Sequence, residues 1–103
     1  MSRIVAIGSR AFVLAMAGVG AEPVQADTVE AFDEALHKVA LRRDVNLVFV
    51  PEPQIEAVPD TMKAFSERSA AALLALPLTP GDDHPSLTQV RRLVEQATGA
   101  SLI

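Results

Sequence analysis

Three short apolar runs constrain the fold of this chain more than any other feature. They lie at residues 4–7, 47–50 and 72–76, and none of them contains a polar side chain. The runs at 4–7 and 47–50 are typical of strands that are buried on both faces of a parallel sheet. The run at 72–76 is followed by Pro77 and Pro80, and these flanks favour a further strand. A shorter, mixed segment at residues 23–26 predicts a weaker edge strand. The sequence therefore predicts a four-stranded, mostly parallel sheet.

Helical patterns separate the predicted strands. Ser9 is a good N-cap for a helix that ends before Gly18, and Asp27 and Glu30 have the spacing of a capping box that opens a second helix. The apolar positions of this second helix recur at helical spacing: Val29, Phe32, Leu36, Val39 and Ala40. Strands therefore alternate with helices from the start of the chain.

A third helical pattern spans residues 55–65 and contains Pro59, which must kink the helix or restart it. Its expected apolar positions are Ile55, Val58, Met62 and Phe65. Ser86 and Gln89 form another capping box and predict a final helix that ends at Gly99. A strand is therefore followed by a helix four times.

This order predicts a single small α/β domain of the flavodoxin or receiver type, with an open sheet and helices on both faces. Residues 1–80 are expected to form the sheet domain. Residues 81–103 are expected to form a loop and a C-terminal helix that contacts a partner and could detach from the sheet.

The N-terminal residues share some features of a secretory signal peptide and lack others. Arg3 precedes apolar residues, but Arg10 interrupts them, and the stretch at 12–17 is shorter than the roughly 7–15 residues of a signal peptide. No apolar stretch approaches the roughly 18 residues of a membrane span. We therefore expect a cytoplasmic protein with no direct membrane insertion.

Composition excludes several kinds of function. The net charge of −4 argues against nucleic-acid binding, which requires a basic face. The chain has no cysteine, which excludes disulfides and thiolate metal sites. The basic pairs at residues 42–43 and 91–92 are interpreted as solvated helix positions.

The strand ends lack the residues that reactions in this fold require. A dinucleotide site needs three glycines after the first strand, but Gly8 is followed by Ser9 and Arg10. A receiver needs an aspartate at the end of its central strand, where this chain has Pro51. His37 and His84 lie far apart in the sequence and make a weak metal site. We expect no catalytic residue, no cofactor and no metal.

The first helix carries more apolar side chains than one sheet face requires. Phe12, Ala15, Met16 and Val19 have core spacing, which leaves Val13, Leu14 and Ala17 on the other sides of the helix. Two interpretations stay open. The core could cover more of this helix, or the surplus could be an apolar patch kept for a partner.

The order and spacing of several segments resemble the F subunit of the V-type and A-type rotary ATPases. The segments are residues 4–8 (IVAIG), 14–20 (LAMAGVG), 47–50 (LVFV) and 90–99 (VRRLVEQATG). The family often has aspartate where this chain has Ser9, and its aromatic residue near the Leu-Ala segment is displaced to Phe12 here. The resemblance covers nearly the whole chain.

This resemblance implies a non-catalytic rotor subunit of the central stalk. Such a subunit binds the D subunit, which forms the coiled-coil shaft, and meets the catalytic A and B subunits. It supports ATP hydrolysis coupled to proton or sodium transport. It belongs to the soluble sector, peripheral to the membrane, and the ATP chemistry belongs to other chains.

The residues expected to contact a partner lie on the first and last helices. On the last helix, an apolar stripe that includes Leu87 and Val90 would face a partner or the sheet of the chain itself. Arg91 and Glu95 stand at i,i+4 and could pair, or Arg91 and Arg92 could meet acidic partner side chains. The full set of candidates is Val13, Leu14, Ala17, Leu87, Val90, Arg91, Arg92, Val94 and Glu95.

Two functions of other classes stay open at this point. The first is a small-ligand or phosphoacceptor signalling domain of the same fold that acts as an interaction module. The second is an enzyme fragment whose site is completed by another chain.

Overall fold

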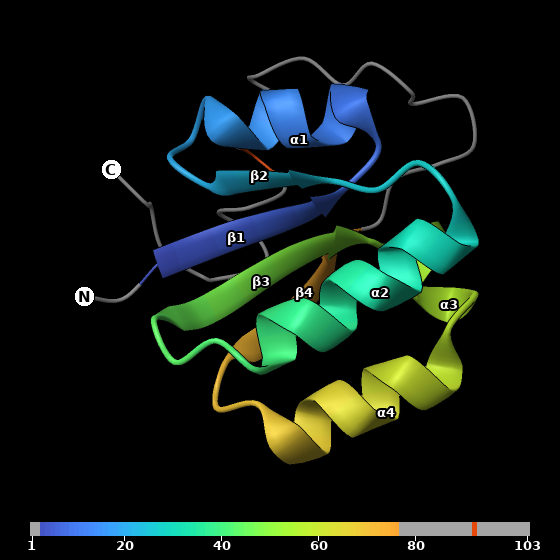
Figure 1. The fold of residues 1–103 in the computed structure, drawn as a ribbon. Coiled ribbons are helices and arrows are strands. Elements are labelled where there is room, and N and C mark those ends of the chain that lie inside the picture. The colour runs from blue at the N-terminus through green and yellow to red at the C-terminus, as the bar shows by residue number, and fades with distance from the viewer. Residues whose placement is uncertain (1–2, 77–91, 93–103) are drawn as a thin grey trace.

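The computed structural model describes residues 3–76 and residue 92. Eight elements follow one another along the chain (Figure 1): β1 Arg3–Gly8, α1 Arg10–Ala17, β2 Glu22–Gln25, α2 Val29–Ala40, β3 Val45–Pro51, α3 Glu52–Glu56, α4 Pro59–Arg68 and β4 Ala72–Leu76. The strands form one sheet in the order β2-β1-β3-β4, and each neighbouring pair is parallel. The four predicted strands are confirmed.

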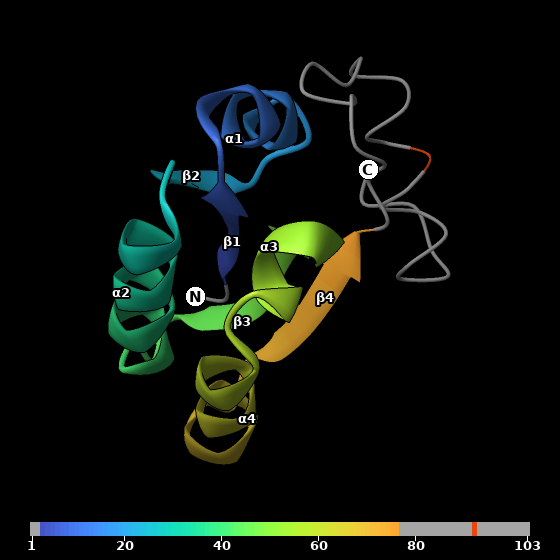
Figure 2. The same cartoon turned by 90° about the vertical axis from the view of Figure 1, so that its right-hand side faces the viewer.

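Helices lie on both faces of this sheet. α1 lies on one face, and α2, α3 and α4 lie on the other (Figures 1 and 2). The core is accordingly divided into two clusters. Phe12 and Met16 of α1 belong to one cluster with Phe49 of β3, whereas Phe32 of α2 and Phe65 of α4 belong to the other. The predicted fold class is confirmed.

α1 begins and ends as its sequence predicts. Ser9 is its N-cap, and its hydroxyl oxygen accepts the backbone N–H of Phe12 at 3.4 Å. The helix ends at Gly18. Gly20 then adopts a φ of +94°, a left-handed conformation that favours glycine because other residues carry a Cβ. The chain can thus reverse direction within a few residues before β2 begins.

The start of α2 differs from the prediction. The N-cap is Thr28, whose side chain accepts the N–H of Ala31 at 3.0 Å, so the capping box of Asp27 and Glu30 is wrong. Val29 was an expected core position but is 55% exposed, because it occupies the first turn at the margin of the packed face. Ala35 is buried in that core instead.

Pro59 restarts the third helix and does not kink it. α3 ends at Glu56, and Pro59 occupies the first position of α4, where the missing N–H costs no intrahelical hydrogen bond. Ile55 and Val58 are buried as predicted. Phe65 is buried as predicted, but Met62 is 41% exposed and was wrongly placed in the core.

The predicted final helix, and with it most of the segment 81–103, lies outside the described residues. Arg92 is described, and it is helical and exposed. Within the part of the chain that the structure describes, no helix is both long and apolar enough to cross a membrane.

Candidate functional site

The carboxyl ends of β1 and β3 are the usual ligand position of this fold, and here the chain's own side chains fill it. A Cβ added to Gly8 would lie 2.8 Å from Phe12 Cδ2, 3.1 Å from Gln54 Oε1 and 3.1 Å from Pro51 Cγ. The backbone at Gly8 is therefore in close contact with protein groups from α1, β3 and α3. Gln54 Oε1 is buried in the structure and has no hydrogen-bond partner among the described residues.

The N-terminus of α1 is also occupied by protein groups. Phosphates bind such helix ends in related folds because the first backbone N–H groups point outward. Here the Ser9 hydroxyl accepts the N–H of Phe12, and Asp27 Oδ1 accepts the N–H of Arg10 at 3.4 Å. The Asp27 carboxylate also accepts a hydrogen bond from the side chain of Gln25. An anion at this position would meet a negative charge.

Of the three α1 residues predicted to face a partner, two are exposed and one is not. Leu14 is 58% exposed and Ala17 is also exposed. Val13 is only 2% exposed, so its assignment to the leftover surface is wrong. It lies in the core cluster that includes Phe49 and Leu76, which shows that α1 uses a wide arc of its surface to cover the sheet. Of the six remaining candidates, Arg92 is described and is exposed. The other five, Leu87, Val90, Arg91, Val94 and Glu95, lie outside the described residues.

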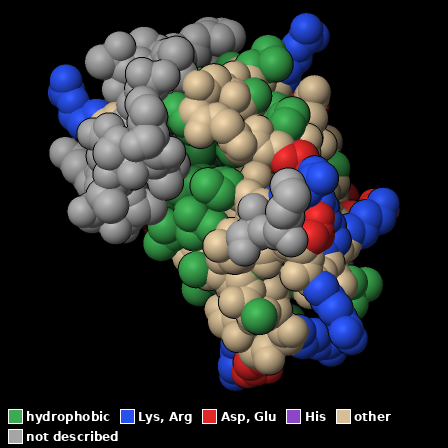
Figure 3. Space-filling view, turned by 90° about the vertical axis from the view of Figure 1, so that its left-hand side faces the viewer, with side chains coloured by type: hydrophobic (Ala, Val, Ile, Leu, Met, Phe, Trp, Pro, Cys, Tyr) green, Lys and Arg blue, Asp and Glu red, His purple; other side chains and the backbone are tan. Residues whose placement is uncertain are grey.

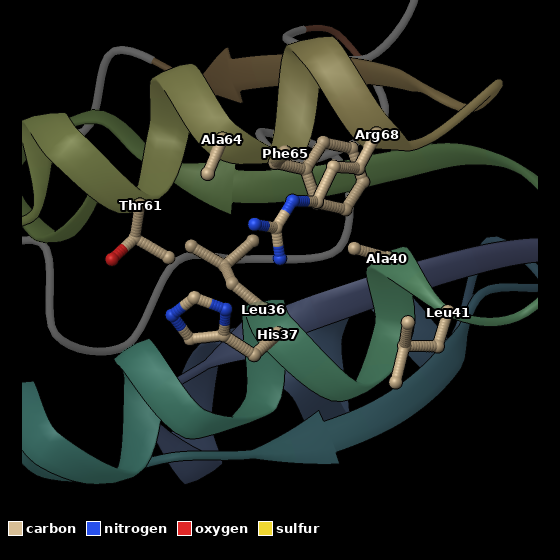
Figure 4. A pocket seen from close by; sticks show the side chains of 8 residues that line it. All are labelled: Leu36, His37, Ala40, Leu41, Thr61, Ala64, Phe65 and Arg68. Carbon is tan, nitrogen blue, oxygen red and sulfur yellow. The ribbon is translucent and has the colours of Figure 1, made fainter.

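A narrow cleft separates α2 from α4 (Figure 4). Its volume is about 100 Å³, and its lining includes the apolar residues Leu36 and Phe65. Leu41, at the end of α2, also lines the cleft and is 79% exposed. On the α4 side, the Thr61 hydroxyl donates a hydrogen bond to Asp33 of α2. The cleft is therefore small, and a polar contact between α2 and α4 adjoins it.

A larger groove lies between α2 and the edge strand β2. Its volume is about 340 Å³. It is lined by four apolar and four polar residues: Val24, Ala31, Ala35 and Val39, with Gln25, Glu34, Lys38 and Arg42. Glu34 and Lys38 form an ion pair at 2.9 Å, one turn apart on α2. The groove thus combines apolar side chains with a charged rim.

Four charged residues form a network where the strands begin. Arg42, just after α2, contacts Glu22 at the start of β2 at 2.5 Å and Asp44 at 2.8 Å. Arg3, at the start of β1, contacts Glu22 at 3.1 Å and Asp44 at 3.4 Å. Figure 3, which views the end of the sheet where the strands begin, shows acidic and basic side chains side by side.

The network shifts the ionisation of its own members. The hydrogen bond from Arg42 is the main cause that lowers the pKa of Glu22, and it is likewise the main cause that lowers the pKa of Asp44. The same hydrogen bonds raise the pKa of Arg42. The interpretation of Arg42 as a solvated helix position is therefore wrong. Asp44 lies two residues from Arg42 in the sequence, but Glu22 lies twenty residues away. The proximity of Glu22 to Arg42 follows only from the arrangement of β2 in the folded chain.

The described residues offer no centre for metal binding. Among them, no group of three or more His, Asp or Glu side chains is arranged to hold a metal ion. His37 lies on the exposed side of α2, 3.7 Å from Asp33, and the second histidine, His84, lies outside the described residues. The features that remain in the described part of the chain are surfaces: the outer side of α1, the cleft and the groove.

Comparison with known proteins places the chain in a family. The model of the ATP synthase (F/14-kDa) subunit family matches residues 4–94. The F subunit of the V-type ATP synthase of Fusobacterium nucleatum subsp. nucleatum is 26% identical over 104 residues, which cover 100% of this chain and 97% of that protein. No solved structure gives a significant match. Because the family model spans nearly the whole chain, this protein belongs to the ATP synthase (F/14-kDa) subunit family.

Proposed function

We propose that this chain is a non-catalytic central-stalk subunit of a V-type or A-type rotary ATPase. In this role it binds the D subunit, which forms the coiled-coil shaft, and meets the catalytic A and B subunits. It thereby supports ATP hydrolysis that is coupled to proton or sodium transport, while the hydrolysis itself takes place on other chains. The match to the ATP synthase (F/14-kDa) subunit family over residues 4–94 is the observation that carries this proposal.

The filled end of the sheet supports the non-catalytic part of the proposal. Phe12, Pro51 and Gln54 surround Gly8 at the position where this fold usually binds its ligand. Asp27 places a carboxylate at the N-terminus of α1, where a phosphate would otherwise bind. A nucleotide would have to displace buried side chains and meet a negative charge. These features also disfavour the small-ligand and phosphoacceptor alternative.

The partner contacts that we propose lie on two parts of the chain. Leu14 and Ala17 supply the exposed apolar side of α1. In the proposed division of the chain, residues 1–80 are the sheet domain and residues 81–103 are the partner-contacting segment. The proposed contacts in that segment are Leu87, Val90, Arg91, Arg92, Val94 and Glu95. With these contacts the subunit is cytoplasmic and peripheral to the membrane, held there by its partners.

Reconstitution tests the proposal. A rotary complex purified without this subunit is assayed for ATP hydrolysis before and after the full chain is added. We expect the chain to join the complex and raise the rate of hydrolysis, and a shortened chain that ends at residue 85 to join with a weaker effect. Circular dichroism checks that the shortened chain is folded. Failure of the full chain to join the complex contradicts the proposal.

A pair of matched variants tests the α1 contact. Leu14→Asp and Met62→Asp each place a carboxylate at an exposed apolar position, 58% and 41% exposed, on α1 and α4 respectively. Neither change buries a charge in the isolated chain. We expect Leu14→Asp to weaken assembly and Met62→Asp to leave it unchanged. If the two variants assemble into the complex equally well, α1 does not contact a partner.

A further inference from the structure

The groove between β2 and α2 runs along the open edge of the sheet. β2 is the outermost strand on its side of the sheet, and its one neighbour in the sheet is β1 (Figure 1). The lining residues of α2 and its C-terminal end extend from Ala31 to Arg42. At a rise of about 1.5 Å per residue, this stretch is about 16 Å long, or roughly three helical turns. The groove is therefore long enough for a segment of secondary structure.

Its apolar lining is made of small and branched side chains. Ala31 and Ala35 are one turn apart on α2, Val39 follows one turn later, and Val24 lies opposite them on β2. Helices pack with their axes about 8–10 Å apart, and small side chains at the contact permit the shorter separations. An amphipathic helix that docks in such a groove inserts side chains at i, i+3, i+4 and i+7. Ala31 is half-buried, whereas Ala35 and Val39 are 9% and 3% exposed and form the floor of the groove, so no bulky side chain from α2 blocks such a helix.

The charges on the rim already have partners within the chain. Lys38 pairs with Glu34, and Arg42 pairs with Glu22 and Asp44. The rim therefore carries both signs and presents no excess of positive charge for an anionic polymer. It fits a partner whose apolar stripe is flanked by charges of both signs, as in a coiled coil.

Pro23 indicates which kind of partner segment can bind at the open edge of β2, a helix or an added strand. Ala26 donates its N–H to Gly8 of β1 at 2.8 Å. Alternate residues of a parallel strand bond to opposite sides, so Val24 also faces β1, while residues 23 and 25 face the open edge. Pro23 has no N–H, so one donor that a pairing strand needs is missing from this edge. The edge is poorly suited to strand addition, whereas a helix needs no such donor.

From these observations we propose that the β2–α2 groove receives one helix of a coiled-coil partner. The proposal rests on the function proposed above, in which that partner is the shaft subunit of the complex. Side chains at i, i+4 and i+7 of the shaft helix pack against Val24 and Ala31, above the floor that the buried Ala35 and Val39 form.

Two matched tryptophan variants test the proposal in the full chain. Ala31 lines the groove and Ala40 lines the cleft on the other side of α2, and both are half-buried. Ala31→Trp fills the groove, and Ala40→Trp fills the cleft. Isothermal titration measures the Kd of each variant for the purified shaft subunit. We expect Ala31→Trp to raise the Kd about tenfold or more and Ala40→Trp to change it by about twofold at most.

Methyl NMR on the unmodified chain gives a second measurement that does not depend on the folding of a variant. We expect the shaft subunit to shift the methyl signals of Val24 and Val39 more than those of Leu36 and Leu41, which line the cleft. The reverse pattern overturns the proposal, as does an unchanged Kd for folded Ala31→Trp.

Other outcomes separate the groove proposal from the proposed function. If the unmodified chain does not bind the shaft subunit, the proposed function fails and the groove proposal fails with it. If the unmodified chain binds and Ala31→Trp binds equally well, only the groove proposal fails. Self-association of the chain alone that Ala31→Trp abolishes assigns the groove to a second copy and also overturns the proposal.

Discussion

Arg42 reaches across the start of the sheet to Glu22, with its Nη1 atom 2.5 Å from Glu22 Oε2. The two residues are 20 positions apart and join the end of α2 to the edge strand β2. The same guanidinium donates two hydrogen bonds to Asp44, which precedes β3. β2 is only four residues long, and this ion pair fixes its first residue, Glu22, to the end of α2. It also holds one end of the β2–α2 groove, because Arg42 is part of the lining.

We predict that Arg42→Met lowers the free energy of unfolding by about 1 kcal/mol, the upper range for a partly exposed ion pair. The side chain of Arg42 is 31% exposed, so solvent screens the network only in part. Urea denaturation followed by circular dichroism measures the change. Arg43→Gln is the matched control, because the described structure gives the exposed Arg43 no ion pair. A loss of similar size in both variants contradicts a specific role for Arg42.

The lowered pKa values of Glu22 and Asp44 predict a pH dependence of stability. A carboxyl group whose pKa is lower in the folded state stabilises the fold above its unfolded pKa, and this contribution is lost as the pH falls through the folded pKa. The unfolded values are about 4.3 for Glu and 3.9 for Asp. The network's contribution is therefore constant above about pH 5 and decreases below it.

Arg42→Met provides the comparison for this pH dependence. Without the guanidinium, both carboxyl groups lose the main cause of their lowered pKa, so the variant should lose less stability than the unmodified chain between about pH 5 and pH 2. Urea denaturation at several pH values measures the two curves. If the free energy of unfolding changes with pH in the same way in both chains, the network does not couple protonation to folding.

We predict that Gly8→Ala destabilises the fold by about 1–3 kcal/mol, the usual cost of overpacking a core. The new methyl group would lie 2.8 Å from Phe12 Cδ2, and Phe12 is 2% exposed and cannot move away freely. Thermal and urea denaturation measure the change. Gly18→Ala serves as the control: its φ is −64°, which alanine adopts without strain, so stability should be unchanged or slightly higher.

Gln54→Met tests whether the side-chain oxygen of Gln54, which lies beside Gly8, accepts a hydrogen bond in the folded chain. Gln54 Oε1 is buried and has no hydrogen-bond partner among the described residues, and a buried acceptor of this kind costs about 1–3 kcal/mol. Methionine has a similar length and no such requirement, so the variant should be as stable as the unmodified chain or more stable. The same denaturation experiment checks this. A clear loss of stability indicates that Gln54 accepts a hydrogen bond in solution.

The sequence predicted the elements whose signals are local. The central strands β1 and β3 contain continuous apolar runs, and their burial follows from these runs alone. β4 is also an apolar run, but it is an edge strand in which only Leu76 is buried, and the sequence does not reveal this difference. Ser9 also caps α1 as predicted, because its partner Phe12 is three residues away. These interactions depend on spacing along one segment, and spacing can be read from a single sequence.

The errors arise where distant segments meet. Asp27 has the spacing of a helix cap, but in the folded chain it binds the N–H of Arg10, 17 residues away, and Thr28 caps α2 instead. Helical spacing alone places Val13 on the surface, because one strip of α1 is enough to cover a single sheet face. In the structure α1 covers that face with a wider arc, and Val13 is buried. Such outcomes depend on the packing of the sheet, which spacing alone does not determine.

The proposed function requires that this subunit acts by binding other chains and not by binding a nucleotide. Titration of the isotope-labelled chain, first with Mg²⁺-ATP and then with the shaft subunit, tests this requirement in one NMR experiment. We predict that ATP leaves the backbone signals of Gly8, Arg10 and Asp27 unchanged and that the shaft subunit forms a stoichiometric complex. Saturable shifts of those three signals with ATP, without complex formation with the shaft subunit, would contradict it.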